Sequence, residues 1–176
     1  MQKKITQIPM DKNDQLIAGF AALAITIHLL ESAFPSPVPG IKPGLANLVT
    51  LYVLIRYGWS LAVNVTLIRV IAGSLLLGSF LSPTFAMSLA GALASLGALW
   101  LAWSCPGKPF GPIGLSIIAA MAHITAQVVT AYLLFIPHAS LFTLLPIFLT
   151  AALISGTLGG ILVHKILERT HNLVST

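Results

Sequence analysis

The sequence predicts an all-α integral membrane protein, a bundle of six transmembrane helices with both termini in the cytoplasm. Of its 176 residues, 57% are hydrophobic and only 7% are charged, and the mean hydropathy is +0.96. Soluble domains carry roughly 25% charged residues, so the composition indicates burial in lipid. Long apolar runs, separated by connections rich in Pro and Gly, take up nearly the whole chain.

Because a helix needs about 20 residues to cross a bilayer, the apolar runs predict spans at 16–34, 44–57, 60–81, 84–103, 113–135 and 141–165. The second run reaches only about 21 Å against a core of roughly 30 Å, so it is either short or buried among its neighbours. The first run ends without a small-x-small cleavage site and is expected to be retained. We expect one transmembrane domain over 16–165, with cytoplasmic tails at 1–15 and 166–176.

The basic residues predict the orientation. With a cytoplasmic amino terminus, only Lys42 among the connecting residues lies outside. The basic residues then placed inside are Lys3, Lys4, Lys12, Arg56, Lys108, Lys165 and Arg169. This bias agrees with the positive-inside rule. An odd number of spans would place Lys165 and Arg169 outside the cell, against that rule.

Several function classes are excluded by composition. The net charge of +5 is scattered over short loops and tails without a basic stripe, so no nucleic-acid partner is expected. The single cysteine, Cys105, excludes an internal disulfide, and no Cys/His spacing resembles a zinc site. We therefore predict no metal and no cofactor.

Arg69 lies near the middle of the 60–81 run, where a charge costs about 2.5–3.5 kcal/mol on insertion scales. Three interpretations remain open: an ion pair with Glu31, a ligand-facing cation, or a side chain that snorkels to the surface. Glu31 is the only acidic residue in any predicted span, but it lies within one turn of the outer end. Arg69 lies about 15 Å from either surface, which argues against direct contact between them.

Three predicted helices carry polar stripes. His28 and Glu31 share a face of the first helix. The other two stripes comprise Thr66, Arg69 and Gly73 on the third helix, and Ser116, His123, Gln127 and Thr130 on the fifth. Ala18 and Ala22 form a small-xxx-small pair, rotated by roughly 130° from the His28 face. That pair either docks a partner helix or packs within the chain.

Specific motifs carry a resemblance to a known family. They are Pro39-Gly40-Ile41-Lys42-Pro43-Gly44-Leu45-Ala46-Asn47-Leu48-Val49-Thr50, Leu67-Ile68-Arg69-Val70 with Gly73, Ser88-Leu89-Ala90-Gly91, Gly114-Leu115-Ser116, and Ala122-His123 with Gln127. The chain resembles the bacterial heptaprenyl diphosphate synthase component I family, also called Gx transporter family proteins. It departs from that pattern at Pro43, where relatives commonly have another residue.

The resemblance implies further expectations. The family is similar in size and layout to the substrate-binding S components of energy-coupling factor (ECF) transporters. By that similarity, the segment 35–44 is a lid over an outward-facing site, and Ala18 and Ala22 dock a coupling subunit. The resemblance also implies localisation in the bacterial cytoplasmic (inner) membrane, as a multi-pass protein.

No catalytic residues are expected. Prenyl elongation needs clustered aspartates that hold magnesium against a diphosphate, whereas the only aspartates are Asp11 and Asp14. No acid is placed to orient a histidine for nucleophilic catalysis. A phosphate-binding Walker loop is also absent from the sequence, so ATP-driven transport would require a separate ATPase subunit.

The leading functional prediction is a membrane-embedded binding and uptake subunit for a small, partly anionic or zwitterionic metabolite. Its predicted site is lined by Arg69, His123, Gln127, Asn47, His28, Glu31 and Lys42. The first alternative is a non-catalytic membrane accessory of a soluble heptaprenyl diphosphate synthase subunit in isoprenoid-quinone biosynthesis. The second is a purely structural assembly partner.

Overall fold

A computed structural model describes residues 11–33, 45–107 and 109–174, with side chains up to Thr170. Within these ranges all regular structure is helical. The elements are α1 (Lys12–Ala33), α2 (Asn47–Tyr57), α3 (Trp59–Leu76), α4 (Pro83–Ser104), α5 (Pro112–Leu134), the 3-10 helix η1 (Ala139–Leu144) and α6 (Leu145–Val174). The predicted lid, 35–44 with Lys42, lies outside the described residues.

Five helical segments are long and apolar enough to cross a membrane: α1, α3, α4, α5 and the η1–α6 segment. The prediction of an all-helical, multi-pass membrane protein is therefore confirmed. The sixth, α2, has only 11 residues and rises about 17 Å, roughly half of a bilayer core. The count of six complete spans stays a prediction.

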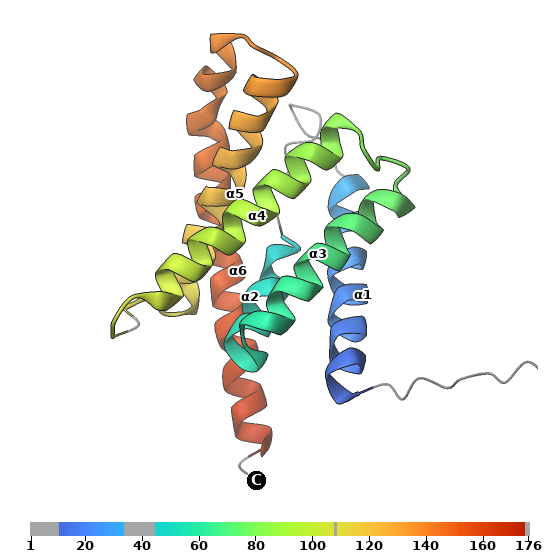
Figure 1. Cartoon of the computed structure of the whole chain (residues 1–176). Coiled ribbons are helices and arrows are strands. Elements are labelled where there is room, and N and C mark those ends of the chain that lie inside the picture. The colour runs from blue at the N-terminus through green and yellow to red at the C-terminus, as the bar shows by residue number, and fades with distance from the viewer. Residues whose placement is uncertain (1–10, 34–44, 108, 175–176) are drawn as a thin grey trace, which may run out of the picture.

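The short helix α2 lies at the centre of the bundle. It packs against α1, α3, α5 and α6, and Figure 1 shows it behind α3, between α1 and α6. Leu51, Val53 and Leu54 are almost completely buried, because protein rather than lipid surrounds this helix. The sequence left open whether the apolar run 44–57 is a short helix or one buried among its neighbours. Helix α2 is both short and buried.

The remaining helices form two groups. Helices α4, α5 and α6 pack successively, and α1 packs mainly against α3. Gly156 and Gly160 of α6 bring its backbone close to Ile117 and Ile113 of α5, which is the scaffold role that small residues serve between transmembrane helices. Figure 1 shows the start of α1 and the end of α6 at the same end of the bundle.

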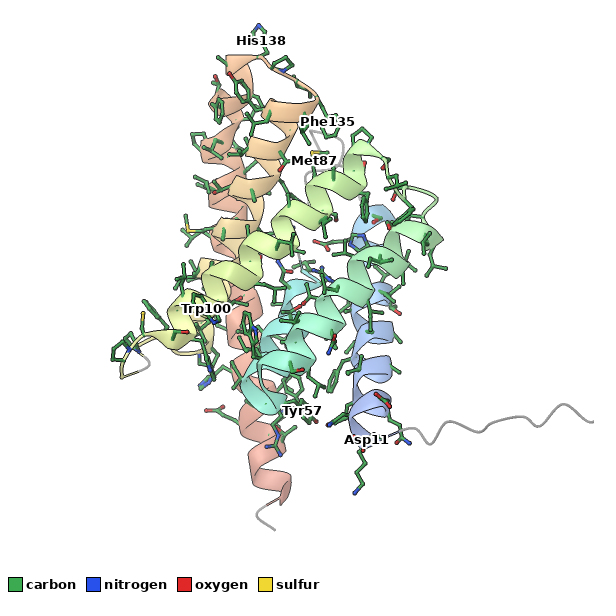
Figure 2. The ribbon with its side chains drawn as sticks, in the orientation of Figure 1. Asp11, Tyr57, Met87, Trp100, Phe135 and His138 are labelled. Atoms are coloured by element: carbon green, nitrogen blue, oxygen red, sulfur yellow. The ribbon has the colours of Figure 1, made fainter. Side chains whose placement is uncertain are left out.

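The two ends of the bundle are marked by labelled side chains in Figure 2. Asp11 and Tyr57 lie at the end that holds the start of α1, and His138 lies at the opposite end. The assignment of the Asp11 end to the cytoplasm rests on the distribution of basic residues and stays a prediction.

Both terminal helices extend beyond the predicted transmembrane limits. Helix α1 already begins at Lys12, where the Asp11 carboxylate accepts a hydrogen bond from the Lys12 N–H at 2.7 Å. Helix α6 continues past Lys165 to Val174, with His164 and Glu168 paired one turn apart at 3.2 Å. Hydropathy locates where the apolar run ends, whereas capping and side-chain pairs extend a helix into water.

Candidate functional site

Arg69 is buried within the bundle. Its side chain is only 3% exposed, which excludes snorkelling to the surface. One guanidinium nitrogen, Nη2, donates a hydrogen bond to Asn47 Oδ1 at 3.0 Å, whereas Nε is buried and has no hydrogen-bond partner. The cation is therefore held at the first residue of α2, and its buried Nε–H is unpaired.

Asn47 connects Arg69 to two further helices. Its Nδ2 donates to Ser95 Oγ on α4 at 3.2 Å, and Ser95 in turn donates to the Ala119 carbonyl of α5 at 2.8 Å. We call Arg69, Asn47, Ser95 and the Ala119 carbonyl the polar chain. It joins four helices through buried groups, and each hydrogen bond inside an apolar bundle avoids the cost of an unpaired polar atom.

Glu31 does not form an ion pair with Arg69, although the structure describes both residues. The Glu31 carboxylate instead accepts a hydrogen bond from the Leu45 backbone N–H at 2.7 Å. The carboxylate thus holds the chain two residues before α2 begins. The N–H groups at the start of a helix have no acceptor within the helix and need one from elsewhere.

Two histidines lie against glycines on neighbouring helices. A Cβ atom at Gly73 of α3 would come within 2.9 Å of the His28 ring, and one at Gly91 of α4 within 2.8 Å of the His123 ring. The sequence predicts a point of close approach at Gly73, on the Arg69 face, and the group that approaches is an imidazole. His123 also shares a hydrogen bond of 3.0 Å with Gln127, one turn away.

The predicted site residues that the structure describes lie on four helices, α1, α2, α3 and α5, and all of them are buried: His28, Glu31, Asn47, Arg69, His123 and Gln127. Hydrogen bonds join Arg69 to Asn47 and His123 to Gln127. Lys42, the remaining predicted residue, lies outside the described part of the chain. Among the described residues, no group of three or more His, Cys, Asp or Glu side chains could hold a metal ion.

Sequence reasoning missed two polar groups of this region. From the sequence, Ser95 is expected only to be a small packing residue beside Gly91, yet it links Asn47 to α5. Thr50 does not stand out in the sequence, and its hydroxyl meets the Thr66 hydroxyl at 2.7 Å. The only available signal was the position of Ser95 one helical turn after Gly91, which places both on one face.

Ala18 and Ala22, the predicted docking pair, are exposed on α1. A Cβ atom at Gly19, between them, would meet nothing within 4 Å. Among the described residues, Ala18 and Ala22 are thus not enclosed by other helices, and their role in docking a partner stays a prediction.

Two hollows adjoin the start of α2. A cavity of about 10 Å³, room for roughly one water molecule, is lined by Asn47 and by residues of α5 and α6. A groove of about 580 Å³ lies between α1 and α6, with an almost entirely apolar lining. Leu45, Leu48 and Ser155 line both hollows, so a single layer of side chains separates the groove from the cavity beside Asn47.

Residues 20–166 match the model of a protein family described as heptaprenyl diphosphate synthase component I. No curated protein and no solved structure matches the chain significantly. The matched range begins within α1 and ends within α6, so it includes the polar chain and both hollows. Since the match extends over most of its length, the chain belongs to the heptaprenyl diphosphate synthase component I family.

Proposed function

We propose that this protein is a membrane accessory subunit of a prenyl diphosphate synthase, in the bacterial cytoplasmic membrane, and that a separate subunit performs the catalysis. The observation that carries this proposal is the family match over residues 20–166. The family description names a component, which implies a partner, and the helices described above make this component the membrane-embedded one.

The buried side chains support a non-catalytic role. A prenyl elongation site must hold magnesium with several carboxylates, and the two aspartates of the chain, Asp11 and Asp14, lie at the start of α1, where both are exposed. Glu31 is the one acidic residue within an apolar run, and it accepts a hydrogen bond from backbone. Among the described residues, the site therefore offers one cation, one carboxylate and neutral hydrogen-bonding groups rather than a metal-binding cluster of carboxylates.

The exposed small residues of α1 support a docking surface for the partner. Ala18, Gly19 and Ala22 let another helix approach closely, because they carry little or no side chain. Here the partner helix would belong to the synthase subunit or to a protein that recruits it.

The test is purification from the native membrane in mild detergent, followed by mass spectrometry of the bound proteins. A soluble prenyl diphosphate synthase subunit is expected to co-purify. A double variant, Ala18→Leu with Ala22→Leu, should reduce its recovery severalfold, whereas Ala139→Leu, a change at an exposed alanine of η1, should not. Recovery of the chain without any synthase subunit would contradict the proposal.

A second candidate, binding and uptake of a small metabolite, is favoured by Arg69. Its buried Nε lacks a partner, and a buried guanidinium is suited to a carboxylate or phosphate. In this case a partly anionic or zwitterionic metabolite binds at the polar chain, a coupling subunit docks on Ala18 and Ala22, and a separate ATPase subunit supplies the energy.

The two candidates differ in what co-purifies and in which variant matters. Uptake predicts an ATPase complex instead of a synthase, and a ligand that raises the melting temperature of the wild type but not of Arg69→Ala. An unchanged ligand-induced shift in Arg69→Ala would remove Arg69 from such a site.

A further inference from the structure

We propose that the small cavity beside Asn47 binds one ordered water molecule, and that this water joins the polar chain to α6. Its hydrogen-bond partners are the side chains of Asn47, Ser116 and Ser155, which all line the cavity. The proposal rests on the geometry of the bundle alone and does not depend on the function proposed above.

The cavity lies where three helices meet, because Asn47 belongs to α2, Ser116 to α5 and Ser155 to α6. Gly156, which also lines it, holds the backbones of α5 and α6 together, since a Cβ atom there would lie 3.0 Å from the Ile117 Cα. Each of the three helices thus contributes one polar side chain to a hollow that is otherwise apolar.

The Asn47 amide keeps hydrogen-bonding capacity for a further partner. Its Oδ1 accepts one hydrogen bond from Arg69, and its Nδ2 donates one to Ser95. A side-chain amide offers two N–H groups and two lone pairs. One donor and one acceptor therefore remain on a residue that lines the cavity.

The two serines also have unused capacity. Ser116 is buried, and none of the hydrogen bonds within the described part of the chain involves its hydroxyl. The Ser155 hydroxyl donates to the Ala152 carbonyl at 3.2 Å, so its lone pairs are available to accept. A buried hydroxyl without a partner is costly, and a water molecule at this place supplies one to both serines.

Size and partner number select water as the occupant. The cavity of about 10 Å³ has room for roughly one water molecule, which needs two to four polar partners. The three side chains supply that number. A divalent cation would need about six oxygen ligands, more than these side chains provide, and a lipid chain or a metabolite is too large.

The water gives α6 a polar connection to the other helices. Within the described residues, every side-chain hydrogen bond from α6 ends in α6 itself, as that from Thr157 to the Leu153 carbonyl does. Apolar packing against α5 does not distinguish protein from lipid. A water bonded to Asn47, Ser116 and Ser155 at once holds α6 at one depth and one rotation against the start of α2.

Ser116→Ala distinguishes a hydrated cavity from a dry one by the sign of its effect. With a bound water, the variant loses one hydrogen bond, and its melting temperature in detergent should fall by about 2–4 °C for a chain of this size. In a dry cavity, the same change removes an unpaired buried hydroxyl and should raise the melting temperature.

Ser74→Ala is the matched control. Ser74 is a buried serine of α3 whose hydroxyl donates to the Ile71 carbonyl of its own helix, and it does not line the cavity. Its loss should leave the melting temperature nearly unchanged, because that carbonyl keeps its backbone hydrogen bond.

A double variant tests whether one water serves both serines. The water is lost only once, so Ser116→Ala with Ser155→Ala should lower the melting temperature by less than the sum of the two single changes. Ser116→Ala with Ser74→Ala should be additive, since those side chains share no partner. Strict additivity in both pairs would contradict a shared water.

A high-resolution crystal structure of the full chain provides the direct observation. One density peak is expected within about 3.2 Å of polar atoms of Asn47, Ser116 and Ser155. A structure that shows ordered water elsewhere but no peak here would overturn the inference, as would a raised melting temperature for Ser116→Ala.

Discussion

Asn47 is the residue on which the polar chain depends. Its side chain accepts a hydrogen bond from Arg69 and donates one to Ser95. It therefore links the cation on α3 to a hydroxyl on α4. An aliphatic side chain at this position would leave Nη2 of a buried cation without its acceptor. That kind of loss is more costly than the loss of a surface contact.

We expect Asn47→Leu to lower the free energy of unfolding by about 1–3 kcal/mol, because a buried donor and a buried hydroxyl lose their partner together. Asn64→Leu is the matched control, since Asn64 is an exposed residue of the neighbouring helix α3. Melting temperatures of both variants in the same detergent provide the measurement. If the two variants have the same melting temperature, the polar chain contributes no stability.

Polar residues in apolar runs were predictable at this scale, but their partners were not. Arg69, His123 and Gln127 stand out because an apolar helix gives few other reasons for such side chains. Ser95 and Thr50 do not, since a hydroxyl in a helix commonly bonds to its own helix. Thr66 makes both kinds of hydrogen bond, since its hydroxyl meets Thr50 of α2 and also donates to the Ala62 carbonyl of its own helix. The sequence cannot distinguish these uses, because they depend on how the helices are rotated.

At the scale of elements, α4 packs against α5 with Gly91 facing the His123 ring. The absence of a side chain at Gly91 lets the imidazole lie against the α4 backbone. Helix packing in membranes depends on such close approach, because lipid gives no hydrophobic advantage to burying a leucine. The glycine thus fixes both the spacing of the two helices and the place of the ring.

Gly91→Ala is expected to destabilise the protein by about 1–3 kcal/mol, since the new methyl group overlaps the His123 ring unless the helices separate. Gly97→Ala on the same helix should be neutral or stabilising by up to about 1 kcal/mol, because its Cβ meets nothing within 4 Å. Thermal unfolding of the two variants checks this difference. A higher melting temperature for Gly91→Ala than for wild type would contradict the close packing.

The positions of the long helices were predictable from hydropathy, but their ends and the role of α2 were not. The run 60–81 yields a helix that ends at Leu76. Hydropathy could not locate this end, because the turn around Gly78 is as apolar as the helix before it. Helix α2 begins at Asn47 rather than at the predicted 44. Its central position depends on contacts with α5 and α6, residues so distant in sequence that local patterns carry no information about them.

For the whole molecule, the basic residues make a prediction about sidedness. Both terminal helices have their free ends at one end of the bundle, and His138 lies at the other. If the positive-inside rule applies, His138 faces the exterior and Cys105 faces the cytoplasm.

Labelling with a membrane-impermeant maleimide in intact cells tests this orientation. The wild type, whose single cysteine is Cys105, should remain unlabelled until the cells are opened. A Cys105→Ser, His138→Cys variant should be labelled in intact cells. The opposite pattern would invert the assigned topology.

The central place of α2 also constrains the order in which the protein assembles. As the chain emerges from the ribosome, α2 is made long before α5 and α6, two of the helices that enclose it. Until they arrive, a helix of half-membrane length lacks much of the protein surface that buries its polar first residue, Asn47. Final positioning of α2, and with it the completion of the polar chain, must therefore wait for the end of synthesis, so a chain truncated after α4 would have inserted helices but no assembled site.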